Sequence, residues 1–238
     1  MNVTRKCGRR GTPSLMLLLA AVVWAVPIHV FADEAQDARQ LVEKARLTLQ
    51  AFLADKEMGP PLKRLLHRAT GVLIYPQVLR AAFLVGASGG SGALVVHEAQ
   101  TKQWAGPAFY TIGQGSFGLQ AGADASEVVL VALTERGVNA LLSTSAKLGA
   151  DVGITLGPVG AGAAAATANL SADIISYARA KGLYAGVSVD GAVVATRDAL
   201  NAAYYGKEVS PTDILLRRNV SNKQAAGLLS TVSHAAGK

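Results

Sequence analysis

Apolar positions near the start of the chain recur with the spacing of a helix. Between residues 33 and 53 they fall at positions 38, 41, 42, 45, 49, 52 and 53, which make one helical face. Asp33, Glu34 and Asp37 occupy the first turn, where the helix dipole favours anions. The pattern predicts a helix over 33–53, and Gly59-Pro60-Pro61 then provides a break that suits the start of another.

The segment 62–69 predicts a short second helix with two unlike faces. At about 100° per residue, its apolar side chains gather on one side: Leu62, Leu65, Leu66 and Ala69. The opposite side is purely cationic and carries Lys63, Arg64, His67 and Arg68.

From residue 71 onward the pattern changes to short β-branched or alternating runs separated by glycines, which is typical of antiparallel strands. The runs are 72–75, 83–85, 93–96, 108–112, 117–121, 128–133, 152–156, 174–177, 184–189 and 192–196. Asp190-Gly191 predicts a two-residue hairpin between the last two. One helix is expected over 138–147, ended by Gly149.

Signals for helices close the chain. They are the segment 198–205, a cap at Ser210-Pro211-Thr212-Asp213, and a capping box of Ser221 with Gln224. Because strands and helices do not alternate, a doubly wound parallel sheet is disfavoured. The predicted class is α+β, with an antiparallel β sandwich or barrel-like sheet, an N-terminal helical segment and C-terminal helices.

The first residues have the pattern of an export signal. Basic residues between Arg5 and Arg10 lead into an apolar run of about 12 residues, shorter than the roughly 18 needed for a membrane-spanning helix. We expect cleavage after Ala32 and a periplasmic or cell-envelope location, with secretion as the alternative. Cys7 leaves with this peptide, so the exported chain has no thiol for disulfides or metal ligation.

The domain organisation follows from these boundaries. We expect a signal peptide over 1–32, N-terminal helices over 33–69, a β-rich core over 70–218 and a C-terminal helix or tail over 219–238.

Most of the net positive charge of the chain lies in the predicted signal peptide. The formal net charge is +7, but four cations precede Asp33, so the exported chain carries only +3. That balance excludes a polycation that binds nucleic acid by charge alone. With 50% hydrophobic and 16% charged residues, the chain is able to bury a core.

Two glycine-rich stretches invite a phosphate-binding interpretation. The stretch 113–118 matches the dinucleotide fingerprint G-x-G-x-x-G, but it is followed by a strand pattern and not by the helix that the fingerprint requires. The stretch 86–92 is either an anion-binding nest, a flexible hairpin or a close approach of two backbones. We expect no nucleotide or other cofactor.

Catalytic and metal-binding patterns are weak. Ser88, Ser91 and Ser116 flank glycines but none lies in G-x-S-x-G, and an enzyme would need a histidine within hydrogen-bond reach of one of them. The three exported histidines form no metal-ligand spacing. We therefore expect no catalytic residues, no metal site and no enzyme.

The cationic side of 62–69 is the remaining candidate site. Either it is a solvated face of a helix whose leucines pack on the sheet, or it meets an anionic membrane surface. Three Lys/Arg residues supply only about 1 kcal/mol each. Useful binding then requires the leucines to enter the interface as well, or further cations, for which Arg80, Arg179 and Lys181 are candidates.

Six blocks in order along the exported chain resemble the SYLF domain family. They are Ala69–Pro76, Trp104–Tyr110, Gly118–Gly122, Gly157–Gly160, Ser176–Gly186 and Tyr204–Gly206. The similarity runs over roughly residues 35–218, and six ordered blocks are far more specific than any single motif.

The resemblance implies a non-enzymatic lipid-binding module. Eukaryotic members bind phosphoinositides, in part through an amphipathic N-terminal helix, and in yeast members the domain also binds and bundles actin. By this analogy the lipid-binding residues are those of 62–68: Leu62, Lys63, Arg64, Leu65, Leu66, His67 and Arg68. Arg80, Arg179 and Lys181 stay candidate helpers on the ground of their charge. The expected partner is an anionic phospholipid surface, and actin is a partner only after delivery into a host cell.

A cell-envelope structural or interaction module that binds protein or glycan is the competing hypothesis. Burial of Leu65 together with pairing of Lys63 to an internal carboxylate would favour it. Tyr177, Tyr184, Tyr204 and Tyr205 are expected to pack in the core.

Overall fold

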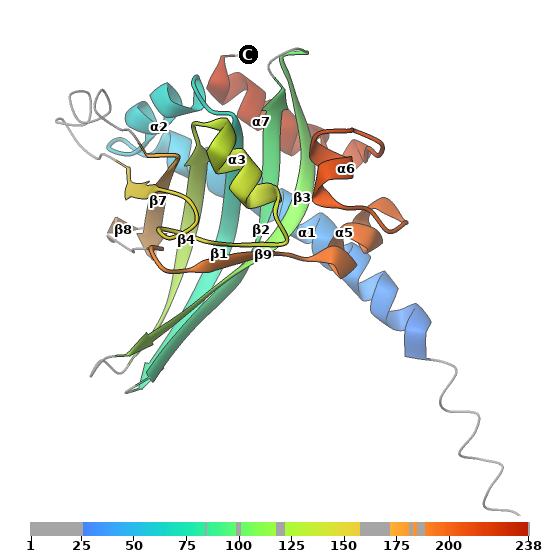
Figure 1. Ribbon diagram of the computed structural model, residues 1–238, viewed down its shortest axis with the longest axis horizontal. Helices are drawn as coiled ribbons and strands as arrows, with labels where there is room; N and C mark the ends of the chain where they lie inside the picture. Colours follow the sequence, from blue (N-terminus) through green and yellow to red (C-terminus); the bar gives the residue numbers. More distant parts are fainter. Residues whose placement is uncertain are drawn as a thin grey trace, which may run out of the picture.

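A computed structural model describes the fold of residues 26–83, 85–98, 101–117, 122–157, 172–180, 183–184 and 189–237 (Figure 1). Within these ranges the side chains of residues 26–32, 82, 83, 85, 116, 117, 122, 183 and 184 lie outside the description. The fold is α+β, as predicted: one curled antiparallel sheet with helices before and after it in the chain.

The helices and strands alternate little along the chain. The helices are α1 (Val26–Ala54), α2 (Gly59–Leu66), α3 (Glu135–Leu142), α5 (Asp198–Tyr205), α6 (Pro211–Leu215), the 3₁₀ helix η1 (Lys223–Ala225) and α7 (Ala226–Ala236). The strands are β1 (Gly71–Phe83), β2 (Val85–Glu98), β3 (Gln103–Phe117), β4 (Gly122–Ala132), β5 (Ser145–Lys147), β6 (Ile154–Leu156), β7 (Ile174–Ala180), β8 (Leu183–Tyr184) and β9 (Val193–Thr196).

The sheet has the strand order β5-β9-β3-β2-β1-β4-β7-β6, with β8 paired to β7. All of these pairs are antiparallel except β6 with β7. The four long strands β3, β2, β1 and β4 form its centre, and the short strands extend it on either side.

The long strands correct the predicted series of short ones. The glycine runs that were predicted to separate strands lie inside β2 and β3. At the bulge between Ile74 and Gln77, a Cβ on Gly90 would lie 2.2 Å from the carbonyl oxygen of Gln77, and one on Gly92 would lie 2.5 Å from the Tyr75 ring. Of the alternatives for 86–92, close approach is therefore the one observed, and no anion nest forms there.

Each face of the sheet has its own hydrophobic core. On one face, α1, α2, α5 and α7 cover a cluster that includes Phe52, Ile74 and Phe109. On the other face, α3, α6 and the segment around β9 cover a cluster that includes Tyr75 and Leu130. Because strand residues alternate between faces, neighbouring positions such as Ile74 and Tyr75 serve different cores.

Several local predictions differ from the structure. The helix expected over 33–53 begins at Val26, and the one expected over 62–69 spans Gly59–Leu66. The helix expected over 138–147 is α3, which ends at Leu142, and Ser145–Lys147 form the strand β5. The Thr134 side chain caps α3 by accepting a hydrogen bond from the Gly137 amide. The capping box of Ser221 is absent, because Asn222 caps the 3₁₀ turn instead. The strand after Asp190-Gly191 is β9, and it pairs with β3 and β5; the preceding residues 185–188 lie outside the described part.

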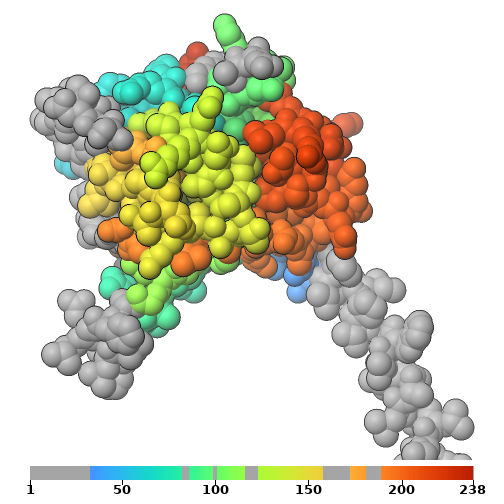
Figure 2. Space-filling view, in the orientation of Figure 1, coloured from blue at the N-terminus to red at the C-terminus, as the bar shows by residue number. Residues whose placement is uncertain are grey.

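The far half of the four long strands forms an arm. β9 pairs only with residues 110–113 of β3, and β7 pairs only with residues 126–132 of β4. Beyond those points the described strands β3, β2, β1 and β4 pair only with one another. The arm projects from the body at the lower left of Figure 1 and is visible in the space-filling view of Figure 2.

Candidate functional site

The apolar side of α2 is locked into the protein. Leu62, Leu65 and Leu66 are each 0% exposed and belong to the core between the helices and the sheet. The leucines therefore pack on the protein's own core and do not enter an interface with a partner. Only the cationic side of α2 is presented to a partner in this conformation.

That cationic side is free of internal neutralisation. Lys63, Arg64, His67 and Arg68 are exposed, and none of them takes part in an ion pair within the part of the chain that the structure describes. Of the two observations that would together favour a purely structural helix, burial of Leu65 is met and pairing of Lys63 is not. We call Lys63, Arg64, His67 and Arg68 the α2 basic face.

One of the acidic residues shortly before α2, Asp55, stabilises the turn that precedes the helix. Asp55 Oδ1 accepts hydrogen bonds from the backbone amides of Glu57, at 2.8 Å, and Met58, at 2.9 Å. These bonds, the one from Met58 foremost, lower the pKa of Asp55 and keep it charged. Asp55 thus helps to fix the start of α2.

The end of α7 supports the basic face from the side. Gly237 follows α7 in the left-handed region (φ 63°), and a Cβ added to it would lie 2.5 Å from Cε1 of His67. The His67 ring therefore rests directly on the backbone of Gly237. This contact joins α2 to the last described residues of the chain and helps to hold the basic face in one orientation.

Arg179 is removed from the set of candidate membrane-binding cations. Its guanidinium forms a close ion pair with Glu127 on the neighbouring strand and lies 5.0 Å from the centroid of the Phe52 ring. Thr48 of α1 donates a hydrogen bond to the same carboxylate at 3.2 Å. The Arg179 side chain is 14% exposed, so it joins α1 to the sheet and does not form part of a free cationic surface.

Of the other two helpers, Arg80 is not brought to α2. Arg80 is exposed on the arm, nine residues after Gly71, which is about 30 Å along the strand. Lys181 lies outside the described residues. Among the residues that the structure describes, the candidate site therefore consists of the α2 basic face.

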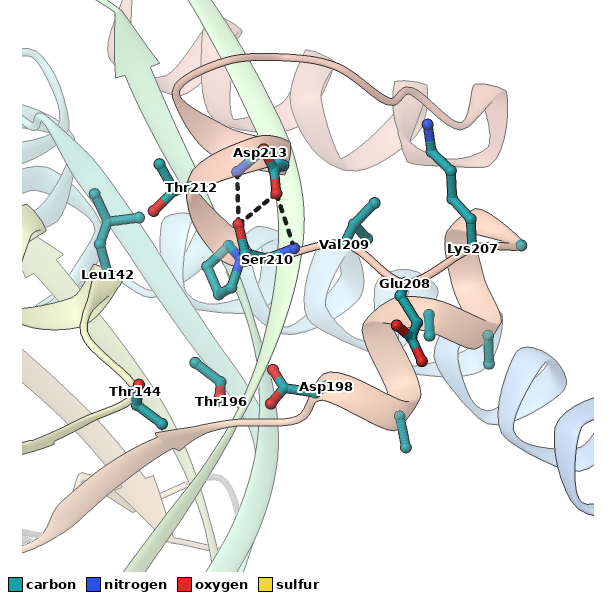
Figure 3. A pocket seen from close by; sticks show the side chains of 15 residues that line it. Leu142, Thr144, Thr196, Asp198, Lys207, Glu208, Val209, Ser210, Thr212 and Asp213 are labelled. Atoms are coloured by element: carbon teal, nitrogen blue, oxygen red, sulfur yellow. Dashed lines mark hydrogen bonds between the residues drawn. The ribbon is translucent and has the colours of Figure 1, made fainter.

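A concave region lies away from α2, between β9, α5 and α6 (Figure 3). This hollow has a volume of about 1140 Å³, and the carboxylates of Asp198, Glu208 and Asp213 line it. Hydrogen bonds from Ser210 and Arg217 lower the pKa of Asp213 to about 2. Three carboxylates beside a single lysine are unsuited to an anionic headgroup, so this hollow does not compete with α2 for lipid.

Three polar side chains named above, or of the same type, have contacts of their own in the described part of the chain. Ser91 accepts a hydrogen bond from Arg197 at 2.8 Å, His67 lies on Gly237, and His234 is 3.4 Å from Ser230. The residues that the structure describes also contain no cluster of three or more His, Cys, Asp or Glu suited to a metal ion. Among the described helices, none is both long and apolar enough to cross a bilayer.

Comparison with known proteins shows the family. Residues 113–235 match the family model Ysc84, described as Las17-binding protein actin regulator. The chain belongs to the Ysc84, or SYLF, family. Protein YSC84 of Saccharomyces cerevisiae is 32% identical over 191 residues, which is 78% of this chain and 40% of that protein. SH3 domain-containing YSC84-like protein 1 of Homo sapiens is 30% identical over 192 residues, 78% of this chain and 56% of that protein.

The resemblance to the SYLF domain that rests on six blocks is thereby confirmed. This chain spans about half the length of these Ysc84-family relatives. Another relative is LAS seventeen-binding protein 3 of Saccharomyces cerevisiae, whose name states that it binds Las17.

Several family blocks have a structural role here. Gly157 lies against the Tyr177 ring, which a Cβ would meet at 2.3 Å. Tyr177 and Tyr204 are buried, and the Tyr205 hydroxyl donates to the Pro107 carbonyl at 2.7 Å. The expectation of core packing is met for these three tyrosines, while the side chain of Tyr184 lies outside the described part.

Two features could not be found by reasoning from the sequence. The contact among Thr48, Phe52, Glu127 and Arg179 joins residues up to 131 positions apart and carries no local signal. The arm is hidden in the sequence because its glycines resemble strand breaks. The arm shows itself in the alternation of apolar and polar rows across its paired strands, and these rows can be assigned only once the strand register is known.

Proposed function

We propose that this SYLF-family chain is an exported, non-enzymatic protein that binds anionic phospholipid surfaces peripherally through the α2 basic face. The observation that carries the proposal is the state of Lys63, Arg64 and Arg68. All three are exposed, and none has a carboxylate partner among the described residues. Buried leucines and the contact with Gly237 hold the helix beneath them in place.

The expected binding by α2 is electrostatic and weak. Three cations near an anionic leaflet contribute about 1 kcal/mol each, which corresponds to a dissociation constant in the millimolar range or weaker. Because the leucines are buried, they add no hydrophobic insertion. The contact is therefore reversible and decreases as salt screens the charges.

The ligand chemistry is a phosphate-bearing headgroup on a membrane. For an exported protein the available lipids are phosphatidylglycerol, cardiolipin, phosphatidic acid or lipid A, and a phosphoinositide would be met in a host cell. Actin or an actin regulator such as Las17 becomes a partner only in a host cell.

Charge reversal on α2 tests the proposal. In sedimentation with vesicles of phosphatidylglycerol and phosphatidylcholine, Lys63→Glu with Arg64→Glu is expected to reduce the salt-sensitive binding at least about tenfold, because two attractive charges become repulsive. Circular dichroism checks that the variant folds.

The matched control reverses two other exposed lysines. Lys147→Glu with Lys207→Glu changes the net charge equally, and both residues lie away from α2, near β5 and α6. This variant is expected to keep most of the binding. Binding that ignores the anionic lipid content, or equal losses in both variants, would contradict a specific role of the α2 basic face.

The burial of the leucines favours a second candidate function. A helix that packs wholly on its own sheet suits an envelope module that binds protein or glycan through another surface. This alternative predicts no binding to vesicles of any composition. It also predicts that binding to the protein or glycan partner is unchanged when Lys63 and Arg64 are reversed.

A further inference from the structure

The arm has two faces of opposite character. In one cross-strand row, the register places Ala125, Leu79, Gly89 and Gly113 side by side. Two residues further out, the next row on the same face is Ala123, Ala81, Ala87 and Gly115. Neither row contains a polar side chain, and we call these two rows the apolar arm face.

The row between them points to the other side of the sheet. It consists of Asp124, Arg80, Ser88 and Gln114, all polar. The register then pairs Phe83 with Val85 and Val85 with Phe117, so the positions that continue the apolar side are again apolar in sequence. On the other side, the row beyond the polar one is Ala82, Gly86, Gly122 and Ser116. The arm is therefore amphipathic at the polar row, with the period of two that strands require.

The apolar arm face is open to solvent. Leu79 is 56% exposed, and Ala81, Ala87, Gly115 and Ala123 are exposed as well. This face continues the side of the sheet that α1 and α7 cover nearer the body, but those helices leave Leu79 uncovered. An exposed apolar face that runs on from a buried core is a candidate interaction surface.

The size of the face argues against a second copy as its occupant. Four strands about 4.8 Å apart, over about five residues, give a face of about 300 Å². Two such faces stacked together would bury about 600 Å² in total, whereas a specific protein interface needs at least about 1,000 Å². A stable dimer would need contacts beyond the arm.

We infer that the apolar arm face enters the boundary between lipid headgroups and acyl chains of a membrane. There, the apolar rows contact acyl chains, while Arg80 and the polar row stay among headgroups, as an amphipathic element does at an interface. The outer edges of β3 and β4, at residues 114–117 and 122–125, pair with no further described strand. Because unpaired backbone groups are costly in hydrocarbon, the arm lies in the boundary and does not span the bilayer.

This inference rests on the proposed membrane association and deepens it. The α2 basic face supplies attraction that salt removes, and the apolar arm face supplies binding that salt does not remove. Since the two lie about 30 Å apart along β1, simultaneous contact would lay β1 along the membrane surface.

Neighbouring residues of β2 give the sharpest test. Ala87 lies on the apolar arm face and Ser88 on the polar row. Ala87→Cys and Ser88→Cys, each in a full-length chain that also carries Cys7→Ser, are labelled with nitrobenzoxadiazole. On adding phosphatidylglycerol vesicles, the label at 87 is expected to brighten and to be quenched by nitroxide acyl chains, and the label at 88 to respond much less. Equal responses, or silence at both positions while the protein co-sediments, overturn the inference.

A charge test separates the arm from α2. Leu79→Glu with Ala81→Glu is expected to lower the binding that persists at about 0.5 M salt at least about tenfold. Ser88→Glu with Gln114→Glu adds the same charge to the polar row and is expected to have a much smaller effect. Circular dichroism confirms folding of both variants.

The outcomes of the two proposals are distinguishable. If reversal of Lys63 and Arg64 abolishes binding and the arm labels do not respond, membrane contact by the arm is overturned and the proposal for α2 stands. If the arm labels respond and the α2 variant binds as well as the unchanged protein, the proposal for α2 is overturned and the one for the arm stands. If the label at 87 responds to protein concentration without vesicles, the arm mediates self-association and the inference of membrane contact is overturned. If the protein does not bind vesicles at all, both proposals are overturned.

Discussion

At the scale of single residues, the Glu127 carboxylate joins three separate elements. It accepts from Arg179 and from Thr48, and Arg179 in turn covers Phe52. A helix and two strands thus meet at one partly buried carboxylate. From sequence alone Arg179 is expected to be a surface cation, because nothing near it in the chain reveals a partner 52 positions away.

Removing that carboxylate is expected to destabilise the fold. Glu127→Ala leaves a guanidinium that is 14% exposed without its partner, and we expect the free energy of unfolding to fall by about 2 kcal/mol. Urea unfolding measures this.

An exposed pair on α1 provides the control. Glu43→Ala breaks the ion pair between Glu43 and Arg46, which lies on the solvent side of the helix, and should change stability far less. Equal effects of the two variants would show that the Glu127 contact contributes no more than a surface pair.

At the scale of elements, the glycines of β2 allow the sheet to bend. The bulge at Ile74–Gln77 brings the backbone and ring of β1 against Gly90 and Gly92. The sequence predicted α5 with its observed bounds and the cap at Ser210 with Asp213, because those signals are local. It missed the length of β1 to β4, because a glycine that ends a strand and one that admits a close neighbour look the same in sequence.

Alanine substitutions at Gly92 and Gly115 distinguish a glycine that a close neighbour requires from one that has open space beside it. Gly92→Ala would place its Cβ 2.5 Å from the Tyr75 ring and 2.7 Å from the Ile74 carbonyl oxygen, so we expect a loss of about 2 kcal/mol in the free energy of unfolding. Gly115→Ala meets nothing within 4 Å and should be close to neutral. Thermal and urea unfolding of the two variants check this, and a stable Gly92→Ala would contradict tight packing at the bulge.

At the scale of the whole molecule, the candidate contacts lie at opposite ends of β1. The basic face precedes its start, and the apolar arm face lies at its far end. Amphipathicity of α2 was readable from the sequence, since its residues are consecutive. The direction in which its leucines point was not, since that depends on the sheet and on α7, which begins far along the chain at Ala226.

Export predicts a defined mature chain. With cleavage after Ala32, the protein recovered from the periplasm begins at Asp33, and its helix α1 then starts with Asp33, Glu34 and Asp37 in the first turn. Intact-mass measurement of the periplasmic fraction checks the cleavage position. A retained Cys7, detected by thiol labelling of that fraction, would contradict it.

The contact between Gly237 and His67 has a practical consequence for the placement of affinity tags. A tag or fusion partner appended after Lys238 would emerge beside the α2 basic face and shield it or, as a run of histidines, add its own attraction to vesicles. A tag placed before Asp33 would lie about 30 Å away, at the far end of α1. Affinities measured with the two arrangements should therefore differ, and the second reports the native surface.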